Sequence, residues 1–118
     1  MKKIGIIGSR TRDSSLAFDL VQKKFLSIYE EGDQIVSGGC PKGGDRFAEV
    51  IAKKIGIPIL IFYPCWKKYG KAAGFVRNIS IANESDYLIA CAATDRTGGT
   101  EDTIKKFEKL NKGEVYVV

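Results

Sequence analysis

The chain has 118 residues, of which 44% are hydrophobic and 28% charged, and a formal net charge of +5 at pH 7. This size and composition predict a single domain, residues 1–118, that folds without disulfides or bound metal. The absence of histidine excludes Ser-His-Asp and Cys-His catalysis, and three scattered cysteines argue against a zinc site. No apolar run reaches the length of a membrane span, so we expect a cytoplasmic protein without a membrane partner. The positive charge is compatible with acidic ligands or nucleic acid.

Apolar runs that predict strands alternate with helical patterns along the chain. In chain order the predicted elements cover residues 3–8 (strand), 15–31 (helix, capped by Gly32), 34–37 (strand), 47–55 (helix), 58–62 (strand), 74–84 (helix), 87–92 (strand), 100–112 (helix) and 115–118 (strand). We expect residues 63–73 to form a loop rich in aromatic residues and lysines. The residues expected to face the core on the last three helices are Phe47, Val50, Ile51 and Ile55, then Phe75, Ile79 and Ala82, then Ile104, Phe107 and Leu110.

This alternation predicts an α/β fold, a Rossmann-like three-layer sandwich with a five-stranded parallel sheet and helices on both faces. We predict the strand order 3-2-1-4-5, which places the first and fourth strands at the point where the order reverses. Ligands of such sheets bind beyond the carboxyl ends of the strands at that point. The turns after the first, second and fourth strands should therefore border one crevice.

Three glycine-bearing turns follow those strands, at residues 8–10, 37–46 and 97–100. Glycine lets a ligand approach the main chain, and the start of a helix offers unpaired N–H groups to an anion. None of the turns matches the dinucleotide fingerprint or the ATPase P-loop, and we predict no bound cofactor. Our interpretation is that the turns together cradle a phosphate-bearing ligand. The residues expected to contact this ligand are Gly8, Ser9, Arg10, Ser37, Gly38, Gly39, Gly43, Gly44, Asp45, Arg77, Asn78, Thr97, Gly98, Gly99 and Thr100.

Some charged residues near these turns have two interpretations. Arg10 and Arg77 could grip a phosphate or could simply be solvated. Asp45 could cap the helix that follows it, worth about 1 kcal/mol, or accept hydrogen bonds from ribose hydroxyls. Glu101 and Asp102 suit the start of a helix, but they also bring negative charge close to any phosphate unless one binds ribose or acts in acid–base catalysis.

Trp66 and Tyr69 are the aromatic residues of the lysine-rich loop. Together with the nearby lysines they could stack on a base. The alternative is that they pack the loop onto the edge of the sheet.

The ordered set of motifs resembles the YspA-like branch of the SMF/DprA–LOG (SLOG) superfamily. The resemblance spans nearly the whole chain and rests on Gly8-Ser9-Arg10, Ser37-Gly38-Gly39 with Gly43-Gly44-Asp45-Arg46, Gly74-Phe75-Val76-Arg77-Asn78, and Thr97-Gly98-Gly99-Thr100. It implies a compact Rossmann-like fold that binds a nucleotide or nucleotide-derived ligand, as a sensor or a processing protein. It also implies a homodimer.

The same resemblance implies two alternative functions. The Lonely-Guy phosphoribohydrolases of the superfamily cleave the bond between base and ribose phosphate, and here Arg77 and Glu101 would take the catalytic roles. Their pattern has a glutamate three residues beyond the threonine of the last turn, where this chain has Thr103. The DNA-processing branch implies a single-stranded nucleic-acid binder that uses the lysine-rich surface.

Overall fold

The computed structural model covers residues 1–118 and contains one five-stranded sheet, in which every strand pair is parallel. The elements in chain order are β1 (Lys3–Gly8), α1 (Ser15–Ile28), β2 (Gln34–Ser37), α2 (Gly44–Ile55), β3 (Ile59–Ile61), α3 (Trp66–Tyr69), the 3₁₀-helix η1 (Gly70–Ala72), α4 (Ala73–Glu84), β4 (Tyr87–Cys91), α5 (Gly99–Leu110) and β5 (Val115–Val117). The strand order β3-β2-β1-β4-β5 confirms the prediction.

The central strand β1 fixes the position where the strand order reverses. It pairs with β2 on one side, where Ile4 lies opposite Ile35, and with β4 on the other, where Gly8 lies opposite Cys91. The chain therefore leaves β1 and β4 side by side at their carboxyl ends, as open α/β sheets with ligand sites do.

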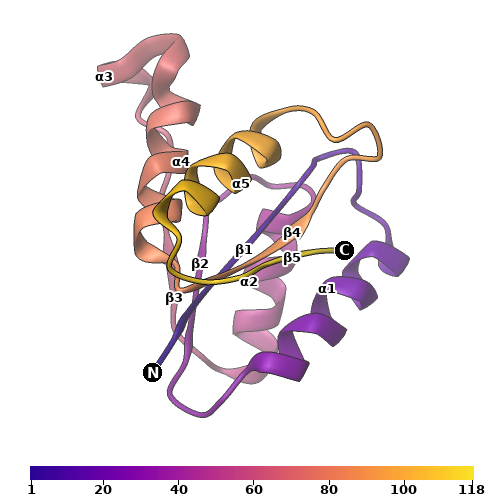
Figure 1. The fold of residues 1–118 in the computed structure, drawn as a ribbon. Helices are drawn as coiled ribbons and strands as arrows, with labels where there is room; N and C mark the ends of the chain where they lie inside the picture. The colour runs from indigo at the N-terminus through magenta and orange to yellow at the C-terminus, as the bar shows by residue number, and fades with distance from the viewer.

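Helices cover both faces of the sheet and enclose two apolar clusters (Figure 1). On one face α1 and α2 pack on the sheet around Phe25 and Phe47, both fully buried. On the other face α4 and α5 bury Ile81 and Phe107. No helix combines the length and the apolar character that crossing a membrane would require.

The first helix ends earlier than the sequence pattern predicts. α1 stops at Ile28 with Tyr29 as its C-cap, and Gly32 lies in the following turn with φ of 94°. The buried Asp33 carboxylate organises this turn, because it accepts hydrogen bonds from the backbone N–H groups of Glu30 (2.9 Å) and Lys2 (2.7 Å). The prediction that Gly32 caps the helix was therefore wrong.

The inward faces of three helices also differ from the prediction. Phe75 and Ile79 on α4 are 57% and 46% exposed, because Asn78 and Ile81 take the buried positions of that helix. The side chains of Val50 and Ile55 on α2 and of Leu110 on α5 are exposed as well. α2 instead packs through a face that includes Ala48 and Ala52, two small residues that allow it to lie close to the sheet. Within the predicted loop 63–73 the structure forms α3 and η1.

Candidate functional site

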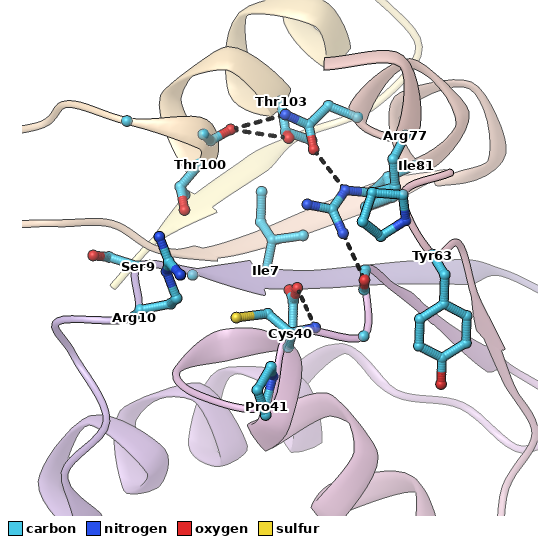
Figure 2. Close-up of a pocket in the computed structure, with 18 of the residues that line it drawn as sticks. Ile7, Ser9, Arg10, Cys40, Pro41, Tyr63, Arg77, Ile81, Thr100 and Thr103 are labelled. Carbon is cyan, nitrogen blue, oxygen red and sulfur yellow. Dashed lines mark hydrogen bonds between the residues drawn. The ribbon is translucent and has the colours of Figure 1, made fainter. Parts of the chain in front are cut away.

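A cavity of about 690 Å³ opens at the carboxyl edge of the sheet (Figure 2). Its walls come from the loops after β1, β2 and β3, from α4, and from the turn that begins α5. The residues that line it are Ile7, Gly8, Ser9, Arg10, Thr11, Gly38, Gly39, Cys40, Pro41, Asp45, Tyr63, Pro64, Trp66, Arg77, Asn78, Ile81, Thr97, Gly98, Gly99, Thr100 and Thr103.

The loop after β1 presents a hydroxyl and a free cation at the rim of the cavity. The Ser9 backbone N–H donates to the Cys91 carbonyl (2.9 Å), which continues the β1–β4 pairing and holds the loop in place. The Ser9 hydroxyl lies 2.7 Å from that of Thr11. Arg10 is exposed and makes neither an ion pair nor a hydrogen bond, and Figure 2 shows its side chain directed toward Thr100. Its guanidinium is therefore available to an anion in the cavity.

The first turn of α5 faces Arg10 and carries backbone N–H groups without partners. The first bond of the helix runs from the Asp102 N–H to the Gly98 carbonyl (3.3 Å), so the N–H groups of Gly99 and Thr100 have no acceptor within the protein. Gly98 takes φ of 97°, which an L side chain rarely adopts. The partial positive charge of the 12-residue helix adds to the attraction for an anion here.

The two acidic residues of that turn, Glu101 and Asp102, are neutralised by hydrogen bonds to neighbouring side chains. The Glu101 carboxylate accepts two hydrogen bonds from the Arg96 guanidinium and does not line the cavity. The Asp102 carboxylate accepts bonds from the Lys106 ammonium and from the Asn78 amide (3.0 Å). Their negative charge is therefore compensated next to the unpaired N–H groups.

The long glycine-rich loop after β2 contributes less to the cavity than the sequence predicts. The buried Ser37 hydroxyl donates to the Ile6 carbonyl (2.6 Å), and the Gly43 N–H donates to the Asp13 carboxylate (2.7 Å). A Cβ on Gly44 would lie 2.2 Å from the Ile7 carbonyl carbon, so this glycine serves the close packing of α2 against β1. Ser37, Gly43 and Gly44 do not line the cavity, whereas Gly38 does.

Asp45 is the one carboxylate in the cavity wall. It does not cap α2, whose N-cap is Gly43. Its buried side chain instead accepts hydrogen bonds from the Cys40 backbone N–H (3.1 Å) and the Ser37 hydroxyl (3.2 Å). Burial raises the pKa of the Asp45 carboxyl above its usual value, although these bonds and the nearby Arg77 charge oppose the shift.

Arg77 and Asn78 connect the two sides of the cavity through their hydrogen bonds. The Arg77 guanidinium donates to the Gly38 carbonyl (2.5 Å) and to the Asn78 side-chain carbonyl (3.0 Å). The Asn78 amide in turn donates to the Gly99 carbonyl (3.3 Å) at the start of α5. A Cβ on Gly38 would lie 2.6 Å from Arg77 Nη1 and 2.8 Å from Asp45 Oδ2, so a larger residue here would have to displace these two side chains. The loop after β2 and the first turn of α5 are thus tied together through α4.

Most of the predicted site residues meet in this cavity. Those that line it are Gly8, Ser9, Arg10, Gly38, Gly39, Asp45, Arg77, Asn78, Thr97, Gly98, Gly99 and Thr100. Among the predicted site residues, Glu101 differs most from the role expected of it. Its carboxylate binds Arg96 and does not line the cavity beside Arg77. The sequence-based site omitted several lining residues, among them Tyr63 and Pro64, which follow β3 after Phe62; their place beyond the carboxyl end of a strand was a signal that could have found them. No three cysteine, aspartate or glutamate side chains lie close enough to hold a metal ion.

Comparison with solved structures identifies a protein of similar fold. It is the molybdenum cofactor binding protein from the phototrophic bacterium Rippkaea orientalis, which is 21% identical, with a TM-score of 0.68 over 99% of this chain and 77% of that chain. At this identity the likeness shows a shared fold. No protein-family model and no curated protein sequence matches the chain.

Proposed function

We propose that the cavity binds a nucleotide or nucleotide-derived small molecule, with its phosphate between the loop after β1 and the first turn of α5. The observation that carries this proposal is that the unpartnered Arg10 guanidinium points toward Thr100 (Figure 2), at the helix start where the backbone N–H groups of Gly99 and Thr100 are unpaired. Backbone amides at a helix start together with a free arginine favour phosphate over a neutral group. Binding of a small-molecule cofactor by the protein of similar fold agrees with a ligand of this kind.

The floor of the cavity suits the sugar of such a ligand. Asp45 Oδ2 and Arg77 Nη1 both lie beside Gly38, and their opposite charges add no net charge to this part of the cavity. A carboxyl group can accept hydrogen bonds from ribose hydroxyls, and the remaining guanidinium N–H groups can donate to ribose oxygens. The sugar would therefore lie over Gly38 and the phosphate beyond it.

The experiment that tests the proposal is a thermal-shift screen. The ligands would be nucleoside mono- and diphosphates, NAD, ADP-ribose, cyclic dinucleotides and the molybdenum cofactor. For 118 residues the entropy of unfolding is about 0.25 kcal/mol/K, so 1 kcal/mol shifts Tm by about 4 °C. A ligand at 100 times its Kd stabilises by about 2.7 kcal/mol and should raise Tm by about 11 °C. No shift with any of these ligands at millimolar concentration would contradict the proposal.

The variant Arg10→Ala isolates the phosphate contact, because Arg10 makes no contact that supports the fold. Loss of one charge-assisted hydrogen bond of about 1.5–3 kcal/mol should weaken binding by about 10- to 150-fold with Tm of the free protein unchanged. Lys53→Ala is the matched control, since it removes an exposed cation near the end of α2 and away from the cavity. Equal weakening in both variants would point to general charge attraction instead.

The alternatives have separate readouts. Free base released from nucleoside monophosphates or NAD would indicate N-glycosidic cleavage. In this structure Glu101, the carboxylate predicted to act in that reaction, is bound by Arg96. Steep salt dependence of binding to single-stranded DNA would favour the nucleic-acid binder. The homodimer that the family resemblance implies stays a prediction, which light scattering of the purified protein would test.

A further inference from the structure

Two exposed aromatic side chains form the β3 side of the cavity. Tyr63 is 66% exposed and Trp66 is 61% exposed, yet both line the cavity, with Pro64 between them in sequence. Neither ring stacks on another aromatic residue, and neither side chain makes a hydrogen bond within the protein. Exposed rings in the wall of a pocket are surfaces that a flat, apolar part of a ligand can cover.

The Tyr63 ring packs against the loop after β2 at Gly39, where there is no side chain in its way. A Cβ on Gly39 would lie 2.4 Å from Tyr63 Cε1 and 2.7 Å from Cδ1, and Gly39 takes φ of 75°. Only glycine permits both this backbone conformation and this close contact. The ring is therefore packed against the main chain on one side while most of its surface remains open.

The charge around these rings is positive. The segment from Tyr63 to Ile81, which carries both rings, has four lysines and arginines and no acidic residue. Two of these lysines, Lys67 and Lys68, are exposed on α3, the short helix that begins with Trp66. This end of the cavity therefore disfavours a cationic ring and accommodates a neutral ring attached to an anionic group.

The aromatic end lies across the cavity from the phosphate end. Figure 2 shows Tyr63 on one side of the view and Ser9 and Arg10 on the other, with Arg77 between them. We propose that Tyr63 and Trp66 form a ring-binding subsite that takes the base of the nucleotide-type ligand. The ligand then spans the cavity with its base on the β3 side and its phosphate on the β1–α5 side. This inference rests on the proposed function, and it sets the direction in which the ligand lies.

Trp66 is the single tryptophan of the chain and reports directly on this subsite. The probes are the common nucleoside monophosphates and ribose 5-phosphate, which carries the same sugar and phosphate but no base. At least one nucleoside monophosphate should quench Trp66 fluorescence and bind at least tenfold more tightly than ribose 5-phosphate. Ribose 5-phosphate should bind without this quenching.

Calorimetry on the variant Trp66→Ala then tests the contact. A stacked base is worth about 5- to 150-fold in affinity, so the nucleoside monophosphate should lose affinity within that range while ribose 5-phosphate keeps its own. Trp66→Phe should restore part of the difference. Tyr69→Ala is the matched control, because Tyr69 is an exposed aromatic residue on α3 that does not line the cavity.

Three results would overturn the subsite. In the first, Trp66→Ala leaves the affinity for the nucleoside monophosphate unchanged. In the second, it weakens both probes equally, as a general disturbance of the cavity would. In either case ribose 5-phosphate still binds the wild type and loses affinity in Arg10→Ala, so the proposed function survives. In the third, no probe binds the wild type, and the subsite falls together with the proposed function.

Discussion

Replacing Asn78 by alanine should both destabilise the fold and disorganise the cavity. Asn78 is buried on α4, and its side chain makes three hydrogen bonds. It donates to the Gly99 carbonyl (3.3 Å) and the Asp102 carboxylate (3.0 Å), and it accepts from Arg77 Nε (3.0 Å). The variant leaves all three partners without this group, two of them charged.

The size of the effect follows from these bonds. A hydrogen bond to a charged group contributes about 1.5–3 kcal/mol and a neutral one about 0.5–1.5 kcal/mol. The partners lie close to the open cavity and regain some water, and alanine favours the helix by a few tenths of a kcal/mol. We therefore expect Asn78→Ala to lower the free energy of unfolding by about 2–3 kcal/mol. With about 4 °C per kcal/mol, Tm should fall by about 8–12 °C.

The assay is urea unfolding together with a thermal melt, and Asn83→Ala is the matched control. Asn83 lies on the same helix, is exposed, and makes no side-chain hydrogen bond, so it shares the change in helix propensity and nothing else. Nucleotide affinity should fall in Asn78→Ala and stay constant in Asn83→Ala, because Arg77 and Gly99 lose their common anchor. If the two variants unfold at the same urea concentration, Asn78 does not connect α4 to the start of α5 in the way described.

Three further predictions concern Asp45 in the cavity wall and two glycines at the starts of α2 and α4. Because the folded protein raises the pKa of Asp45 above its usual 3.8, the folded state binds this proton more tightly than the unfolded state. The wild type should therefore lose stability relative to Asp45→Asn as the pH rises from 3.8 through the raised pKa, and a constant difference in urea midpoints across pH would contradict this. Gly44→Ala should destabilise by about 3 kcal/mol or more, since its Cβ would lie 2.2 Å from backbone of Ile7. Gly74→Ala should instead stabilise by about 0.5–1 kcal/mol, because α4 leaves open space there; calorimetric Tm values that rank the two glycine variants the other way would refute the packing argument.

The fold could be predicted from the sequence because strands that are buried on both faces have a recognisable apolar sequence pattern. Short runs such as Ile4 to Ile7 without a polar alternation are typical of strands covered on both faces, and their alternation with helical patterns indicates a parallel sheet. It was harder to predict which helix residues face the core, because an apolar residue does not need to be buried. On α4, Asn78 takes a buried position that its polarity hides, while Phe75 stays exposed.

The site was predicted less completely because a glycine in the sequence does not reveal what it faces. Gly43 and Gly44 lie against the main chain of Ser9 and Ile7, contacts that depend on how α2 approaches β1. Gly98 has open space where its Cβ would be, and Gly99 has no neighbour closer than 4.0 Å. Both kinds of glycine follow a strand and precede a helix, so local sequence cannot separate those that serve packing from those that leave room for a ligand.

The two helices that begin at this edge of the sheet also differ in what satisfies their positive ends. At α2 the protein supplies its own anions, because Asp13 accepts the Gly43 N–H and the Asp45 carboxylate occupies the first turn. At α5 the acidic residues of the first turn are bound by cations, and the N–H groups of Gly99 and Thr100 remain unpaired. Unpaired donors at a helix start attract an anion, whereas a helix start that already has carboxylates beside it repels one. An anionic ligand in the cavity should therefore place its charge at α5 and its neutral part toward α2 and β3.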